Sequence, residues 1–349
     1  MKFLILIFAM TTIAMTAPGQ QDTEEPVYIC PPCGNSCDLH KYSQPGICAH
    51  CGMALIREDK VKTIAFYLQN GVEVLDFAGP MEVFAYAGYR VFTVSKTKDP
   101  IKSQGILSVI PDYSIEDAPR ADILAFFGGN AGSAFRDPEV INWIKNQQDV
   151  HFHFSVCTGA FLLAEAGILN GKTATTFHES LDNLERNYPE VDVRRDVRFV
   201  DNGTVITTAG ISAGIDGALH LVAKLQGINV ARRTAYYMEY DNWVPGEGLI
   251  LSKDNPYGFA TALEDLKAYV GKYEFRDNGQ LEIVLDQRTK GLNVVIDRVA
   301  YPLFQERGDV FTDKDGGAVV FQRTSLGQVS GYQIGSNDRL YQKLAGIEN

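Results

Sequence analysis

The chain alternates two kinds of segment between residues 60 and 227, and this alternation constrains its fold most strongly. Short runs rich in β-branched and aromatic residues indicate strands at 60–68, 89–95, 121–129 and 151–157. Helical patterns at 79–88 and 137–148 separate them, and 197–210 is a hairpin around an Asn-Gly turn, followed by a helical stretch at 211–227. Strands and helices in alternation predict an α/β domain with a parallel sheet covered on both faces.

Length and charge limit the organisation and the partners. With 349 residues, the chain is long enough for two or more domains. Its formal net charge of −11 disfavours a surface for nucleic acid or anionic membranes. Small molecules and metal ions are the expected partners, and no segment beyond the N-terminus predicts a membrane span.

The N-terminus has the layout of a secretory signal. Lys2 precedes an apolar stretch from Phe3 to Met15, and small residues surround Ala17. This predicts a signal peptide over residues 1–17 and export to a bacterial-type periplasm or beyond. The alternative is an uncleaved membrane anchor, although the stretch is short for a span.

Five of the six cysteines lie in a short segment that we predict to be a separate module over residues 27–57. Two CxxC pairs, Cys30 with Cys33 and Cys48 with Cys51, have the spacing that presents four thiolates to Zn²⁺, while soft donors at this density also suit copper. A disulfide framework is the alternative in an exported protein. The candidate metal ligands are Cys30, Cys33, Cys37, Cys48, Cys51, His40 and His50.

The sixth cysteine, Cys157, ends a predicted strand just where a helical pattern begins. A side chain at such a turn faces the amides of the next helix, and this environment lowers a thiol pKa and favours a nucleophile. Gly128 and Gly129 end the neighbouring predicted strand, and their amides are candidates for an oxyanion hole. The alternative is a small, inert core cysteine.

The C-terminal part has a different pattern. After a Pro- and Gly-containing linker at 241–258, a short helix precedes runs that alternate apolar and polar residues and turn at Asn-Gly or Asp-Gly pairs. We predict an antiparallel β module over 259–349, a small barrel or half-barrel with a packing or substrate-covering role.

Two segments resemble known families. "YICPPC…PGICAHCGMALI" resembles the heavy-metal-binding domain of bacterial exported proteins, but has Cys33 where methionine is usual and an additional Cys37. "VLDFAGPMEVFAYAG", "FFGGNAG", "SVCTGAFLLAEAGILNGKTATT" and "VRFVDNGTVITTAGISAGIDGALHLV" together resemble the ThiJ/PfpI superfamily, most closely its isonitrile-hydratase-like subgroup. This resemblance covers residues 61–245 and implies a flavodoxin-like sheet and a homodimer.

The ThiJ/PfpI resemblance also implies site residues. Cys157 matches the nucleophile at the strand-to-helix elbow, and Thr158 stands where isonitrile-hydratase-like members have threonine. Asp76 matches the carboxylate that reaches the thiol from the loop after the first strand, with a helix N-cap as its alternative role. His178 is displaced by one residue from a histidine of many relatives, and we expect it at the surface.

Three functions follow from these features. The first is an exported, Cys-dependent hydratase or hydrolase of a small electrophile, with the resemblance pointing to an isonitrile. The second is a noncatalytic metal- or ligand-sensing protein. The third is a thiol redox or metal-handling protein.

Overall fold

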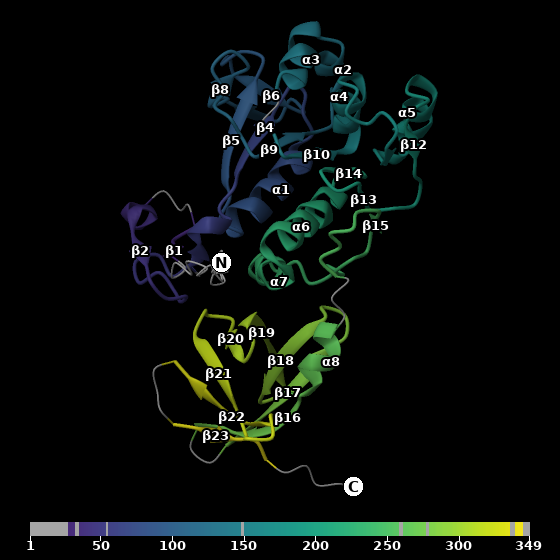
Figure 1. Cartoon of the computed structure of the whole chain (residues 1–349). Coiled ribbons are helices and arrows are strands. Elements are labelled where there is room, and N and C mark those ends of the chain that lie inside the picture. The colour runs from purple at the N-terminus through teal and green to yellow at the C-terminus, as the bar shows by residue number, and fades with distance from the viewer. Residues whose placement is uncertain are drawn as a thin grey trace, which may run out of the picture.

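The computed structural model describes residues 27–31, 35–53, 55–147, 150–257, 261–276, 279–335 and 339–344. The predicted signal peptide at 1–17 and the candidate ligand Cys33 lie outside these residues. In the described part of the chain, no helix has both the length and the apolar character needed to cross a membrane. A small cysteine-containing module, an α/β domain and a C-terminal β module follow one another along the chain (Figure 1).

An eight-stranded sheet forms the α/β domain, in the order β15-β13-β14-β10-β9-β4-β5-β8. All of its pairs are parallel except β13 with β14, the predicted Asn-Gly hairpin. The fold is therefore the predicted flavodoxin-like α/β sheet. Its strands are β4 Thr63–Tyr67, β5 Arg90–Ser95, β8 Tyr113–Ser114, β9 Ile123–Phe126, β10 Phe152–Val156, β13 Phe199–Asp201, β14 Val205–Thr208 and β15 Leu249–Ile250.

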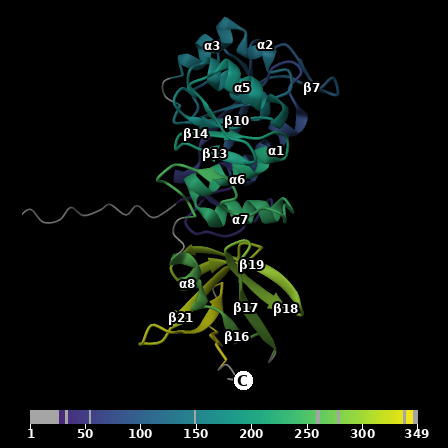
Figure 2. The same ribbon diagram turned by 90° about the vertical axis from the view of Figure 1, so that its right-hand side faces the viewer.

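Helices cover both faces of this sheet, since successive strand residues point to opposite sides (Figures 1 and 2). On one face, Phe66 and Phe154 join a core with Val83 of α1 and Leu219 of α6. On the other, Tyr67 joins a core with residues of α3 and α4. The helices are α1 Val74–Tyr86, α2 Gly132–Phe135, α3 Pro138–Lys145, α4 Ala160–Glu165, α5 Leu181–Asn187, α6 Ala213–Gln226 and α7 Ile228–Tyr237, with the 3-10 turns η3 Cys157–Gly159 and η4 His178–Ser180.

The first helix corrects the sequence prediction. It begins at Val74 and not at residue 79, so Gly79 and Pro80 lie inside it. A Cβ on Gly79 would lie 2.8 Å from the Ile215 side chain of α6, so this glycine permits the two helices to pack closely. Asp76 consequently lies in the first turn of α1, neither in a loop nor at the N-cap, which is Glu73.

The α/β domain also contains two small two-stranded sheets. One is an antiparallel pair, β6 Ile101–Ser103 with β7 Leu107–Val109, and the other is a parallel pair, β11 Thr173–Ala174 with β12 Asp192–Val193. The N-terminal module is a three-stranded sheet, β2-β1-β3, with two 3-10 turns. Its elements are β1 Tyr28–Ile29, η1 Ser36–Leu39, β2 Lys41–Tyr42, β3 Ile56–Arg57 and η2 Glu58–Lys60.

The C-terminal β module is a second eight-stranded sheet, in which each strand pairs with the next in sequence and all pairs are antiparallel. A bridge between Tyr273 and Lys343 joins the two ends, so the sheet curls into a near-barrel around its own aromatic core. Its elements are α8 Thr261–Lys267, β16 Gly271–Glu274, β17 Gln280–Asp286, β18 Gly291–Ile296, β19 Val299–Arg307, β20 Val310–Thr312, β21 Ala318–Arg323, β22 Val329–Ile334 and β23 Tyr341–Gln342.

Candidate active site and cysteine cluster

Cys157 lies directly after β10, at the carboxyl edge of the sheet, and turns the chain into α4. Its φ of 58° is in the left-handed region that a side chain rarely adopts, so the backbone is held in a strained conformation. Gly159 permits this turn, because a Cβ there would lie 2.4 Å from the carbonyl oxygen of Phe126. Strain of this kind at a buried thiol is typical of a functional site.

Asp76 is completely buried, and two backbone amides hold its carboxylate. The amide of Gly128 donates to Oδ2 at 2.9 Å, and the amide of Ile211 donates to Oδ1, also at 2.9 Å. These bonds come from the loops after β9 and β14, so three segments that are distant in sequence meet at one carboxylate. The two amides thus fix the orientation of the Asp76 side chain.

The carboxylate of Asp76 and the thiol of Cys157 meet at Gly128. A Cβ built on Gly128 would lie 2.6 Å from Cys157 Sγ and 2.7 Å from Asp76 Oδ2. The Asp76 carboxylate and the Thr158 amide both lie close enough to the sulfur to shift its pKa. The structure therefore brings Cys157, Asp76, Thr158 and Gly128 into one site at the carboxyl ends of the strands.

The electrostatics of this site differ from the sequence prediction. We predicted a lowered thiol pKa, but burial and the neighbouring Asp76 charge raise the pKa of Cys157 to about 12. Burial likewise raises the pKa of Asp76 to about 6, although its hydrogen bonds oppose the shift. The helix start does not outweigh these effects, because α4 spans only six residues and the thiol is 5% exposed. The sulfur is thus a protonated thiol beside a carboxyl group that exchanges its proton near neutral pH.

One of the two amides predicted to form an oxyanion hole has another hydrogen-bond partner. The Gly128 amide already donates to Asp76, as described above. Gly129 has a φ of 83°, and a Cβ there would lie 2.3 Å from the Gly71 carbonyl oxygen, so close packing explains this glycine. Thr158 Oγ1 donates to the Gly129 carbonyl at 3.5 Å. The Thr158 amide, which faces the sulfur, is the donor best placed to stabilise a developing charge.

Sequence reasoning missed part of the site wall. Ile211, with a φ of 57°, orients Asp76, and a Cβ on Gly210 would lie 3.4 Å from Cys157 Sγ and 2.6 Å from the Phe177 ring. The available signal was the "TAGIS" stretch, which follows a strand and therefore ends at the same sheet edge as Cys157. His178 lies outside the site, with a side chain that is 75% exposed.

Comparison with known proteins supports the assignment of this domain. Residues 62–224 match the model of the DJ-1/PfpI family. The isonitrile hydratase of Pseudomonas putida is 34% identical over 180 residues, which are 51% of this chain and 78% of that enzyme. The chain belongs to the DJ-1/PfpI family.

Other relatives of this DJ-1/PfpI chain are not named as hydratases. The HTH-type transcriptional regulator CdhR of Pseudomonas aeruginosa is 29% identical over 48% of this chain and 51% of the regulator. The Parkinson disease protein 7 homolog of Danio rerio is 29% identical over 47% of this chain and 89% of that protein. The family therefore includes relatives with an enzyme's name and relatives with a regulator's name, and the site chemistry must decide between them.

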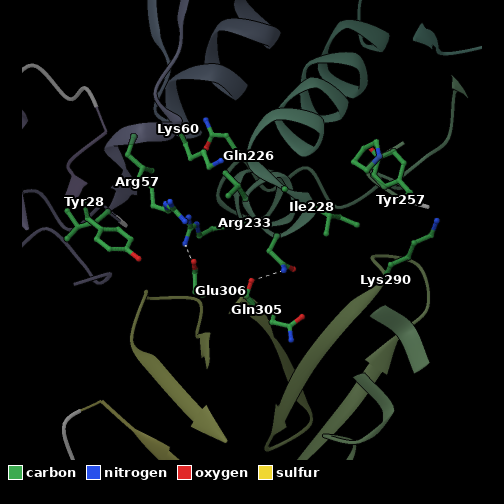
Figure 3. Close-up of a pocket in the computed structure, with 16 residues that line it drawn as sticks. Tyr28, Arg57, Lys60, Gln226, Ile228, Arg233, Tyr257, Lys290, Gln305 and Glu306 are labelled. Carbon is green, nitrogen blue, oxygen red and sulfur yellow. Dashed lines mark hydrogen bonds and ion pairs between the residues drawn. The ribbon is translucent and has the colours of Figure 1, made fainter. Parts of the chain in front are cut away.

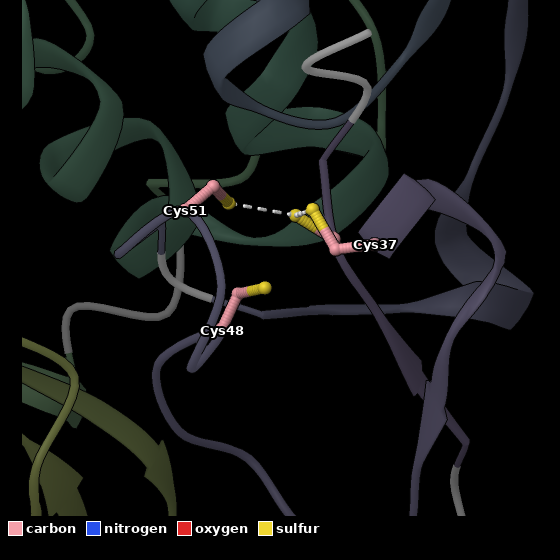
Figure 4. A group of neighbouring side chains, drawn as sticks. Cys37, Cys48 and Cys51 are labelled. Atoms are coloured by element: carbon pink, nitrogen blue, oxygen red, sulfur yellow. Dashed lines mark hydrogen bonds between the residues drawn. The ribbon is translucent and has the colours of Figure 1, made fainter. Parts of the chain in front are cut away.

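A second cluster of reactive side chains lies in the N-terminal module, outside the residues that match the family model. The sulfur atoms of Cys30, Cys37, Cys48 and Cys51 all lie within 4.8 Å of one another (Figure 4). Cys30 and Cys51 approach to 3.2 Å, and Cys37 lies 3.9 Å from Cys30. A tetrahedral Zn²⁺ with bonds of about 2.3 Å separates its sulfur ligands by about 3.8 Å. The four thiols therefore fit a metal ion.

The cysteine cluster contains only some of the residues that the sequence predicted as metal ligands. Cys37, on the turn η1, is a member, whereas the exposed His40 and His50 are not. Cys33 lies outside the described residues, and the five described cysteines form no disulfide with one another. Burial raises the pKa of Cys48, but hydrogen bonds from the Cys51 amide, the Tyr42 hydroxyl and the His50 amide outweigh it and lower this pKa to about 6. Cys48 can thus supply a thiolate at neutral pH, as metal binding requires, whereas burial and the neighbouring thiols raise the pKa of Cys30.

We expect the purified protein to hold about one equivalent of a soft metal ion in this cysteine cluster. Cys37→Ser removes one of the four described sulfur ligands and should lower the bound metal at least tenfold, as measured by elemental analysis after dialysis. His40→Gln, at an exposed histidine outside the group, is the control and should retain the metal. If Cys33→Ser loses the metal and Cys37→Ser keeps it, the two CxxC pairs form the site instead.

Proposed function

We propose that this chain is a Cys157-dependent hydratase of a small electrophilic substrate, and that an isonitrile, converted to an N-substituted formamide, is that substrate. The buried pair of Cys157 and Asp76 carries this proposal, because it places a nucleophile beside a group that can donate and accept a proton. The 34% identity to an isonitrile hydratase supports the choice of substrate.

The chemistry uses Asp76 as the acid and Cys157 as the nucleophile. Protonated Asp76 donates its proton to the isonitrile carbon, and the sulfur forms a bond to the same carbon, which gives a thioimidate. The thiol proton passes to the carboxylate and restores the acid. Water then adds across the carbon–nitrogen double bond, with its oxygen on carbon and one proton on nitrogen. The carbon–sulfur bond breaks, the second water proton goes to the sulfur and the formamide leaves. The sum is one water added to one isonitrile, with no oxidant or reductant.

The raised pKa of Asp76 predicts a pH profile. The acid form dominates below about pH 6, so kcat/KM should fall about tenfold per unit as the pH rises beyond that value. The same measurement on Asp76→Asn should show a kcat/KM at least a hundredfold lower, without the fall above pH 6. Glu82→Gln, an exposed change on the same helix, should keep the wild-type profile. Activity that rises between pH 6 and 8 would instead make ionised Asp76 the active form.

A ligand-sensing role is the second candidate function, because the chain is 29% identical to the transcriptional regulator CdhR over about half of that protein. In this role the site around Cys157 would bind a small molecule without turnover. Calorimetry with a slowly reacting isonitrile distinguishes the two functions, since a sensor binds the compound and releases it unchanged, whereas a hydratase releases the formamide.

Export and dimer formation complete the proposal. The lysine and apolar stretch of residues 1–17 support a signal peptide and a periplasmic or secreted location. Fractionation of cells that express the full chain tests this location, and an unprocessed protein in the cytoplasm would contradict it. Size-exclusion chromatography with light scattering tests the homodimer that the family resemblance implies.

A further inference from the structure

A cavity of about 420 Å³ lies where the three parts of the molecule meet, away from Cys157. Figure 3 shows side chains from the N-terminal module, from the junction of α6 and α7, and from the β module around it. No single part encloses this junction cavity. Its volume is within the range of sites that bind small molecules.

The lining of the junction cavity is positively charged, in contrast to the chain's net charge of −11. Glu306 is the one carboxylate among the described lining residues, and it accepts from Arg233 at 3.3 Å. Arg57 forms an ion pair with Asp59 at 2.8 Å. Among the described residues no ion pair joins a carboxylate to Lys60 or Lys290, although the charges of Lys60 and Asp59 interact. The positively charged lining residues are Arg57, Lys60, Arg233 and Lys290.

The start of α7 adds hydrogen-bond donors to the same cavity. The helix follows Gly227, which has a φ of 99° and supplies no capping side chain. The first bond back to the Gly227 carbonyl is made by the Ala231 amide, at 3.4 Å. The amides of Ile228, Asn229 and Val230 precede that bond, and all three residues line the cavity. Lysine charges and these amides favour the same kind of ligand, an anion.

Apolar groups form the rest of the wall. Leu55 and Ile56 contribute from the N-terminal module and Pro256 from the segment before the β module. The ring of Tyr257 lies 5.7 Å from the Lys290 ammonium, so an apolar surface adjoins a positive charge. A ligand that fills this space has both an anionic group and an apolar body.

We propose that the junction cavity binds a small organic anion, with its carboxylate or phosphate oxygens near Lys60, Lys290 and the start of α7, and its apolar body against Ile56 and Tyr257. Because the lining comes from all three parts, the bound anion would stabilise their mutual arrangement. The proposal does not depend on turnover at Cys157.

Calorimetry on the full-length protein tests the site with three probes of similar size: phenyl phosphate, benzoate and the neutral benzyl alcohol. We expect at least one of the two anions to bind with a stoichiometry of one, and the alcohol to bind at least tenfold more weakly. The stronger anion identifies phosphate or carboxylate as the preferred group. Cys157→Ser should bind the same anion equally well, which separates this site from the active site.

Variants of the cavity complete the test. Lys60→Gln combined with Lys290→Gln should weaken anion binding at least tenfold while turnover and thermal stability stay at wild-type values. Lys172→Gln, a lysine outside the cavity, is the matched control and should bind like wild type. Absence of anion binding by the wild type, or undiminished binding by the double variant, would overturn the proposal.

Discussion

Replacing Cys157 by serine should abolish isonitrile hydration, with kcat/KM lower by at least a thousandfold. The substitution exchanges one atom, but a hydroxyl is a far weaker nucleophile than a thiol in the same position. Loss of a nucleophile that acts together with a proton-transfer partner removes most of the rate enhancement, on the order of 10³ to 10⁶. The measurement is the initial rate of formamide formation at pH 6.

The fold should survive this substitution, because serine keeps the size of the side chain at a buried position. The melting temperature and the metal content of the N-terminal cluster serve as controls and should match the wild type. A Cys157→Ser variant that keeps more than a tenth of the activity would show that the sulfur does not form the bond to substrate.

Replacing Gly128 by alanine should lower kcat/KM at least a hundredfold. The new Cβ would lie 2.6 Å from Cys157 Sγ and 2.7 Å from Asp76 Oδ2, distances that real contacts do not allow. Either the thiol or the carboxylate must move, and a displacement of about 1 Å at reacting groups costs about a hundredfold in rate. Crowding of a packed interior also lowers the free energy of unfolding, by about 1–3 kcal/mol.

Gly132→Ala is the matched control for the Gly128 variant. It also adds one methyl group to a loop-proximal glycine, but its Cβ would have no heavy atom closer than 3.9 Å. We expect wild-type activity from this control. A folded Gly128→Ala protein with unchanged kcat/KM would show that the Cys157 and Asp76 contact does not contribute to the reaction.

The sequence predicted the sheet, the hairpin and the position of Cys157, because these depend on local patterns. Asp137 illustrates this, since it caps α3 by accepting from the Glu139 amide, as the Asp-Pro pair indicated. The start of α1 was predicted wrongly, because a Gly-Pro pair resembles a helix start. Only the packing of Gly79 against α6 shows why the pair lies inside the helix.

The electrostatics could not be predicted from the sequence, because pKa values depend on tertiary burial. The predicted direction of the Cys157 shift was wrong for this reason. His220 gives a second example. Its buried ring lies between Asp201 at 2.9 Å and Tyr257 at 3.1 Å, a contact between residues far apart in the chain. Ile211 is a third example, since its backbone amide, and not its side chain, donates the hydrogen bond to Asp76.

Formamide production by the wild-type protein is the direct test of isonitrile hydration at Cys157. Alkyl isonitriles are incubated with the full-length protein at pH 6, and the formyl proton of the product is followed by NMR. We expect catalytic, multiple-turnover formation of the N-alkylformamide, faster at pH 6 than at pH 8. Isonitriles that bind to the protein and remain unconverted would contradict it and would favour the sensing role.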